Sequence, residues 1–447
     1  MPMLYTSEVR THPTKGSFVM AVARVLGGVL LAATLLFAGL LFAFNRHFHP
    51  VEPKADYPTP KSVLEAQRQD LDYFTKVMAL DRAFSPAARA AAAARVHELN
   101  ALPEALPSQK LQVALMQVMA LADNGHSRLD PTADGSSVVL PVQVTRFAEG
   151  FYVTRASARY SDLLGGRVDS IDGRPIDLIV SRLETLRGGV EGFRRQNAAQ
   201  FMVVQDLLYG LGIAANPNAS TWTVTRPNGE VVTRPLDATQ LQKGLEKDWI
   251  AYRARSGNDD FRLFPTGHCA EVVRLPSISD KIAPFLVSTE KALRTHPPCS
   301  VIVDLRGDGG GDYTNTWHFT HVLPQLTNGR ISILTDPATF SAAITTAAFI
   351  KEAGGSRVTL IGEPVGDRLS FYSEGGRACL PNLKVCVHYQ TGKHDYAHAC
   401  DSWRECFWLN WLYPVRVDNL QPDRLVPFTF ADWDAGIDRA LSTAAAP

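Results

Sequence analysis

An apolar segment near the N-terminus restricts this chain more than any other feature of its sequence. Val25 to Phe44 contains no charged residue, and its twenty residues as a helix reach about 30 Å, the thickness of the hydrocarbon core of a bilayer. A cleaved signal peptide has a shorter apolar stretch of about 7–15 residues, and no small-x-small cleavage site follows Phe44. We therefore expect an uncleaved transmembrane anchor at residues 25–44, with a short cytoplasmic tail at 1–24 and a linker at 45–60.

The cysteines indicate the compartment of the rest of the chain. All six follow residue 268: Cys269, Cys299, Cys379, Cys386, Cys400 and Cys406. An even number of cysteines suits disulfide bonds in an oxidising compartment, although the spacing leaves the pairing open. Neither a C-x-x-C pair nor a coherent Cys/His spacing favours zinc. We expect residues 45–447 to lie outside the cytoplasm, in the periplasm if the source is bacterial.

Charge and composition exclude two broad classes of protein. The 447 residues include 45 Lys+Arg and 45 Asp+Glu, and 45% of them are hydrophobic. Intrinsic disorder requires less apolar material, and nucleic-acid binding requires a basic surface. We expect two or three folded units of roughly 150 residues each and no nucleic-acid partner. The composition does not indicate an oligomeric state.

Residues 61–130 have helical patterning and are expected to form an N-terminal helical domain. Ser85 is a favoured N-cap for an alanine-rich helix over 86–99. A second helix is predicted from Ser108 and ends just before His126.

The patterning changes twice in the remainder of the chain. Residues 131–240 are expected to form a β-rich domain that includes a single helix, with strands at 138–144, 151–154, 167–171, 221–225 and 231–234 and the helix at about 175–187. Residues 260–447 alternate the two element types, with strands at 300–305, 331–334 and 358–361 and helices at 314–326 and 341–353. Such alternation predicts βαβ crossovers and a mostly parallel sheet, so the fold class is α/β.

Two segments of the α/β region have residues suited to acyl transfer. Residues 304–311 form a glycine-rich turn after a buried strand, where backbone N–H groups can approach a ligand closely. The turn fits neither common phosphate-binding motif, whereas an oxyanion-binding loop is consistent with it. Ser341 lies between a strand and a helix, where the helix dipole and the Ala342 amide favour a nucleophile whose intermediate is an oxyanion.

Simpler roles remain open for these residues. Ser341 has the side chain of an ordinary N-cap, and His126, at the end of a helix, can interact with the helix dipole alone. As a general base, His126 would have to reach Ser341 across the fold. His318 and His321, spaced H-x-x-H on a predicted helix, are either a zinc pair or ordinary surface residues.

Taken together, these residues resemble the family of C-terminal-processing (tail-specific) and tricorn-core serine peptidases. Five segments of the chain are similar to motifs of this family. Residues 304–311 are similar to D-L-R-x-N-x-G-G, 339–342 to T-x-S-A, 361–366 to I-G-E-P-T/V-G and 122–127 to D-x-H-T/S. Residues 164–173 are similar to the G-D-x-I-x-x-I-x-G stretch of the family's PDZ-like domain. The resemblance covers most of residues 61–440.

The resemblance implies a ClpP/crotonase-like α/β core with an N-terminal helical element and a PDZ-like domain at 131–240. It implies Ser341 as the nucleophile, His126 as the base used in the tricorn branch, and oxyanion donors at Ala342 with Gly310 or Gly311. The PDZ-like domain would hold the C-terminal segment of a polypeptide substrate by strand addition. No metal or organic cofactor is implied.

The chain departs from the family pattern in two places. Where the tail-specific branch has the lysine of its Ser–Lys dyad, this sequence reads Val-Gly-Asp-Arg at 365–368, so a Ser–His mechanism is favoured. The glutamate that often follows S-A-x is replaced by Ile344. The acidic group that orients His126 stays open among four candidates, Glu363, Glu374, Asp401 and Asp418.

The sequence thus predicts a membrane-anchored serine endopeptidase that cleaves polypeptides outside the cytoplasm. One alternative is a non-catalytic ligand- or peptide-binding protein on the same fold, since the family includes retinoid-binding relatives. The other is a zinc hydrolase that uses His318 and His321.

Overall fold

The computed structural model of the chain describes residues 15–130, 137–240, 245–253, 260–267 and 269–446. The chain forms two compact units, Met1–Val51 and Glu52–Pro447, and each is described by itself. The first contains one long helix, α1 (Lys15–Phe48), which extends beyond both ends of the predicted span. Its segment Val22–Phe48 is 27 residues long and apolar enough to cross a bilayer, and its apolar window is not buried.

The second unit begins with a helical segment. It contains α2 (Val63–Met78), α3 (Pro86–Asn100) and α4 (Ser108–Ala120), and the structure confirms the two helices predicted here. The Oγ atoms of Ser62 and Ser85 cap α2 and α3. The chain then turns through His126 into the short strand β1 (Arg128–Asp130).

An antiparallel sheet follows, at the place where the β-rich domain was expected. Its strands are β3 (Val142–Phe147), β4 (Gly150–Ala156), β5 (Arg167–Ile171), β6 (Arg174–Pro175), β7 (Ala219–Thr225), β8 (Val231–Asp237) and β10 (Ile250–Ala251). Their order in the sheet is β10-β4-β5-β7-β8, and in addition β3 pairs with β4 and β6 pairs with β5. A separate pair joins β2 (Val138–Val139) and β9 (Thr239–Gln240). The predicted helix is α5 (Ile176–Glu184). That this region is PDZ-like stays a prediction.

Two helices in this region were not predicted. They are α6 (Glu191–Phe201) and α7 (Gln205–Gly210). The α6 sequence EGFRRQNAAQF has few apolar residues and therefore little helical periodicity. Its helical conformation depends on tertiary packing, in which Phe193, Ala198 and Phe201 are buried.

The last part of the chain contains the predicted α/β core. Its sheet has the order β11-β12-β13-β14-β15-β20, with strands β11 (Arg262–Thr266), β12 (Ala270–Arg274), β13 (Ser300–Asp304), β14 (Ile331–Thr335), β15 (Val358–Gly362) and β20 (Arg424–Leu425). The pairs from β12 to β20 are parallel and β11 is antiparallel, which confirms the mostly parallel sheet.

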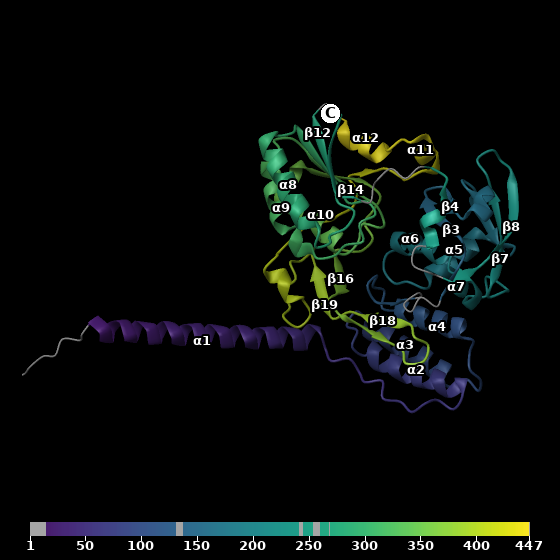
Figure 1. Cartoon of the computed structure of the whole chain (residues 1–447), viewed down its shortest axis with the longest axis horizontal. Helices are drawn as coiled ribbons and strands as arrows, with labels where there is room; N and C mark the ends of the chain where they lie inside the picture. The colour runs from purple at the N-terminus through teal and green to yellow at the C-terminus, as the bar shows by residue number, and fades with distance from the viewer. Residues whose placement is uncertain (1–14, 131–136, 241–244, 254–259, 268, 447) are drawn as a thin grey trace, which may run out of the picture. The chain divides into compact units, whose positions relative to one another are not determined.

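Helices cover both faces of this sheet. On one face lie α8 (Ile282–Thr295), α9 (Trp317–Val322) and α10 (Ala342–Gly354), and on the other lies α12 (Arg439–Ala445), which α11 (Phe430–Ala435) precedes (Figure 1). Alternate side chains of β13 contact the two layers: Val301 and Val303 pack in the α10 layer and Ile302 in the α12 layer. Such strands are buried on both faces and therefore read as continuous apolar runs.

One predicted helix is divided. In place of a helix at 314–326, the chain forms a 3₁₀ turn at Tyr313–Asn315, then α9, then a second 3₁₀ turn at Leu323–Gln325. Pro324 lies in the second turn, and a proline has no N–H to continue α-helical hydrogen bonding.

A hairpin from the core sequence returns to the N-terminal helical segment. Strands β17 (Gly376–Cys379) and β18 (Cys386–Tyr389) form a hairpin, and β18 pairs with β1. A second antiparallel pair, β16 (Ser370–Ser373) with β19 (Gly392–Asp395), flanks it. These contacts bring the turn that contains His126 to the core.

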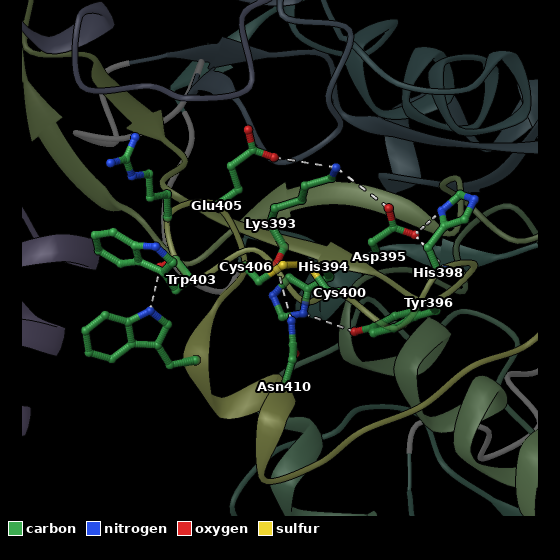
Figure 2. The surroundings of a disulfide bond; sticks show 12 residues. Lys393, His394, Asp395, Tyr396, His398, Cys400, Trp403, Glu405, Cys406 and Asn410 are labelled. Atoms are coloured by element: carbon green, nitrogen blue, oxygen red, sulfur yellow. Dashed lines mark hydrogen bonds and ion pairs between the residues drawn. A yellow bond between two sulfur atoms is a disulfide. The ribbon is translucent and has the colours of Figure 1, made fainter.

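The cysteines form three disulfides, Cys269–Cys299, Cys379–Cys386 and Cys400–Cys406. The second closes the β17–β18 hairpin. The third lies beside Lys393, whose ammonium is 3.7 Å from both Asp395 and Glu405 (Figure 2).

We expect the disulfides to contribute unequally to stability. A disulfide that closes a longer loop removes more entropy from the unfolded chain. Cys269 and Cys299 are 30 residues apart, whereas Cys400 and Cys406 are 6 apart. Replacing the first pair with serine should lower the free energy of unfolding by about 3–4 kcal/mol and replacing the second by about 2 kcal/mol. Urea denaturation under non-reducing conditions measures both, and a larger loss from the second pair would contradict this ranking.

Candidate active site

Ser341 begins α10 but does not cap it. Its backbone has φ +56° and ψ −125°, a conformation that non-glycine residues rarely adopt, and its side chain accepts no hydrogen bond from the first turn of the helix. A capping serine behaves differently: Ser85 has φ −61° and ψ 159°, and its Oγ accepts from the Ala88 amide. The N-cap interpretation therefore does not hold at Ser341. A strained backbone at a strand-to-helix turn is typical of an exposed nucleophile.

The turn before Ser341 is fixed by its own side chains. The Asp336 carboxylate accepts hydrogen bonds from the amides of Gly307 and Thr339 at 3.0 and 2.9 Å. The Thr339 hydroxyl donates to the carbonyl oxygen of Leu305 at 3.0 Å. The end of β13 and the turn that contains Ser341 are thus tied together.

Ion pairs fix the base of the glycine-rich loop. The Arg306 guanidinium contacts Asp304 and Asp438 at 2.8 and 2.7 Å, and Arg274 contacts Asp304 at 2.9 Å. Burial alone would raise the pKa of Asp304, but the two guanidinium groups hold it below its ordinary value. The D-L-R motif therefore has a structural role under the loop.

Gly310 packs directly against the serine. It has φ +100°, and a Cβ at this position would lie 2.6 Å from Ser341 Cβ and 2.8 Å from the Ala342 nitrogen. Its own N–H donates to Asp308 Oδ1 at 2.8 Å. The amide of Gly310, one of the two predicted oxyanion donors in the loop, therefore already has an acceptor. Among the described hydrogen bonds, the amides of Ala342, Gly309 and Gly311 have none.

Side-chain and backbone contacts hold the His126 turn against the core. The Asn124 side chain donates a hydrogen bond to the Tyr372 carbonyl oxygen at 3.0 Å and accepts one from the Tyr372 backbone N–H at 3.1 Å. The Gln390 side chain donates to the His126 carbonyl oxygen at 2.9 Å, and Arg128 pairs with His388 in the β1–β18 ladder. These long-range contacts place the imidazole.

The His126 ring lies between two phenylalanine rings. Its centroid is 4.3 Å from that of Phe340 and 5.3 Å from that of Phe371, with interplanar angles of 28° and 12°. The residue is 8% exposed. Burial, together with the nearby His394, lowers the pKa of His126 well below its ordinary value, so the imidazole is neutral at pH 7.

Asp367 is the carboxylate that lies beside His126, and it is not one of the four candidates from the sequence. Its Oδ2 is 3.9 Å from His126 Nδ1, and it is buried. Burial raises the pKa of Asp367 to about 7. The available signal was its position: Asp367 lies in the segment where the resembled family has its catalytic lysine.

The four carboxylates considered from the sequence lie elsewhere. Glu363 pairs with Arg146 at 3.1 Å, and Glu374 Oε1 is 3.5 Å from Nε2 of His394 rather than His126. Asp401 and Asp418 are exposed. Among the described residues, the carboxylate within 4 Å of the His126 ring is that of Asp367.

His126 and Ser341 line the same cavity. Its volume is about 450 Å³, and its other lining residues are Arg128, Asp130, Arg187, Asn197, Gln200, Phe201, Val204, Gly309 and Phe340. The two side chains do not form a hydrogen bond, and both ring nitrogens of His126 lack a partner among the described residues. In unliganded enzymes catalytic hydrogen bonds are often long and tighten only with substrate.

The predicted zinc pair is not arranged as a metal site. His318 is exposed and contacts Glu290 at 3.1 Å, while His321 Nδ1 is 2.7 Å from the carbonyl oxygen of Trp317. The part of the chain that the structure describes contains no group of three or more His, Cys, Asp or Glu side chains suited to a metal.

Comparisons with known proteins show the fold. No family model matches the sequence. No curated protein matches it either. The solved structure of mature CPAF is similar, with a TM-score of 0.54 and 11% identity over 83% of this chain and 94% of that one. A mutant of CPAF aligns with a TM-score of 0.57 and 12% identity over the same shares. The structure of mature CPAF complexed with lactacystin aligns with a TM-score of 0.55 and 11% identity, over 83% of this chain and 95% of that one. The chain therefore shares the CPAF fold.

Proposed function

We propose that this protein is a serine peptidase in which Ser341 is the nucleophile, His126 the general base and Asp367 the group that orients the base. The observation that carries the proposal is a strained serine at a helix start, sharing a cavity with a neutral histidine that has a buried carboxylate behind it. A serine, a neutral histidine and a carboxylate are the three groups that nucleophilic acyl transfer of this kind uses. The motif resemblance supports the same assignment.

The proposed reaction follows from these positions. Neutral His126 takes the proton of Ser341 Oγ as the oxygen attacks the substrate carbonyl, and Asp367 stabilises the imidazolium that forms. The Ala342 amide, with that of Gly309 or Gly311, donates to the developing oxyanion. Binding of substrate would have to shorten the 3.9 Å between Nδ1 and Oδ2 to hydrogen-bonding distance. No step requires a metal or an organic cofactor.

We also propose where the enzyme acts. The apolar helix α1 would anchor the chain in a membrane, with its folded unit in an oxidising, extracytoplasmic compartment, as three disulfides favour. Its substrates would then be polypeptides of that compartment. The domain at 131–240 is proposed to be the PDZ-like module that holds them.

A second candidate, a non-catalytic binding protein, is favoured by one observation. The His126 ring is held between Phe340 and Phe371, with neither nitrogen hydrogen-bonded among the described residues. A fluorophosphonate probe separates the two functions. The full-length protein in detergent should bind close to one probe per chain, with no effect of a chelator, and lose this reaction on heat denaturation. An unreactive protein that still binds peptides would establish the second candidate.

The pH dependence tests the role of Asp367. Because its pKa is raised to about 7, the carboxylate is ionised above pH 7 and protonated below it, whereas His126 stays neutral throughout this range. The labelling rate should therefore fall about tenfold from pH 8 to pH 6. Asp367→Asn should react about 10²–10⁴-fold more slowly and without this pH dependence. A flat wild-type profile between pH 6 and 8 would contradict the assignment.

A further inference from the structure

Two arginines lie on the wall of the catalytic cavity, and the proposed mechanism uses neither. Arg128 follows His126 by two residues, and Arg187 lies in the loop after α5. Both side chains are partly buried. The other ionisable lining residue besides His126 is Asp130, so the cavity has an excess of positive charge.

The backbone holds Arg187 firmly beside the His126 turn. Gly188 and Gly189 follow it, and a Cβ on Gly188 would lie 2.7 Å from the Asn124 nitrogen. A Cβ on Gly189 would lie 3.2 Å from the nitrogen of Gly125. This contact between two backbones requires glycine at 188 and makes the position of Arg187 part of the same structure that positions His126.

The Arg187 guanidinium has an aromatic neighbour but, among the described residues, no carboxylate at ion-pair distance. Its central carbon, Cζ, lies 5.3 Å from the ring centroid of Phe193. The Phe193 ring stacks on that of Phe340, with 4.3 Å between the two centroids. Among the described residues Arg187 forms no ion pair, and its buried Nε lacks a hydrogen-bond partner. A buried polar group without a partner is costly, and most native structures avoid it.

The carboxylates of Asp130 and Asp367 attract the Arg187 guanidinium, but neither forms an ion pair with it among the described residues. Asp130 lies 3.7 Å from His388, and Arg128 lies 3.5 Å from the His126 carbonyl oxygen. Burial, with Arg128 nearby, lowers the pKa of Arg187 to about 9, which leaves the guanidinium charged at pH 7. The cavity beside Ser341 therefore presents a fixed cation whose planar donors suit a carboxylate.

We propose that Arg187, assisted by Arg128, is a subsite that binds a carboxylate of the polypeptide substrate next to the bond that Ser341 cleaves. This inference rests on the proposed function and names its substrate class. The carboxylate is either an Asp or Glu side chain or the C-terminus of the chain, and both would form the same bidentate contact with a guanidinium.

Two measurements distinguish these sources. The first measurement compares the rates at which two peptidyl phosphonate probes label the full-length protein. The probes differ only in the residue next to phosphorus, which is Glu in one and Gln in the other. In the second, calorimetry measures how a short peptide binds to the Ser341→Ala protein with its C-terminus free or amidated. A charge-assisted contact predicts at least a tenfold preference for the acid in one of the two measurements. Preference in the first identifies a side chain, and preference in the second alone identifies a chain end.

Variants of Arg187 complete the test. Arg187→Gln removes the charge, and Arg187→Met removes it without leaving a buried polar group, so that at least one should remain folded. In either variant, the acid and the amide should react at nearly equal rates in the first measurement and bind with nearly equal affinity in the second. Arg182→Gln is the matched control, because Arg182 is outside the cavity and donates to the Leu211 carbonyl oxygen. It should keep the wild-type ratio.

Failure of this inference is distinct from failure of the proposed function. Equal behaviour of acid and amide in both measurements, or a preference that persists in both Arg187 variants, overturns the carboxylate subsite while Ser341 remains reactive. Absence of any phosphonate adduct overturns the peptidase proposal. The calorimetric preference, which needs no catalysis, would then still decide whether Arg187 binds a carboxylate.

Discussion

Replacing Ser341 with alanine is expected to abolish peptide hydrolysis and fluorophosphonate labelling while leaving the fold intact. Loss of a nucleophile in a serine peptidase lowers kcat by about 10⁴–10⁶-fold. The Ser341 hydroxyl makes no hydrogen bond among the described residues, and alanine keeps the Cβ that packs against Gly310. The free energy of unfolding should therefore change by less than about 0.5 kcal/mol. Hydrolysis rates and urea denaturation measure the two quantities on one preparation.

Ser85 provides the matched control. It also precedes a helix, but its hydroxyl caps α3 by accepting from the Ala88 amide at 3.2 Å. Ser85→Ala should lower the free energy of unfolding by about 1 kcal/mol and leave hydrolysis unchanged. If the two variants behaved alike, Ser341 would be a structural serine and the proposed mechanism would be wrong.

Gly310→Ala is expected to have the largest effect on the geometry of the site. The added methyl would lie 2.6 Å from Ser341 Cβ and 2.8 Å from the Ala342 nitrogen, and the backbone φ of +100° is itself unfavourable for alanine. We expect the free energy of unfolding to fall by about 2–4 kcal/mol. Labelling should be lost even in the protein that remains folded, because the clash displaces the nucleophile and the oxyanion amide together.

The control for backbone strain alone is Gly229→Ala. Gly229 has a similar φ of +81° in the turn between β7 and β8, and nothing lies within 4 Å of a Cβ added there. This substitution should cost only about 1 kcal/mol and leave labelling unchanged. Retained labelling in folded Gly310→Ala would show that the glycine-rich loop does not form part of the catalytic site.

The elements that could be predicted from sequence are those set by local patterns. Strands β13, β14 and β15 are continuous apolar runs that end at turns, so their bounds were predicted to within about one residue. Helix α6 was missed because its sequence has little apolar periodicity and its conformation depends on packing. The pairing of β1 with β18 joins segments more than 250 residues apart, and no local signal indicates it.

The same distinction applies to the site. Ser341 and His126 were predicted because each lies in a recognisable motif, and the structure brings both to one cavity. Asp367 was missed because carboxylates are frequent, and only the contact between the His126 turn and the core shows which one faces the imidazole. Arg187 was missed for a related reason, since its position depends on the backbone contact of Gly188 with Asn124.

The structure of the full chain after reaction with a fluorophosphonate tests the central claim most directly. The account predicts phosphorus bound to Ser341 Oγ, a phosphonyl oxygen accepting from the Ala342 amide, and His126 Nε2 within about 3.2 Å of an oxygen of the adduct. Asp367 should then lie at hydrogen-bonding distance from Nδ1, closer than the present 3.9 Å. An adduct on another residue, or a His126 ring still without partners beside a phosphonylated Ser341, would contradict it.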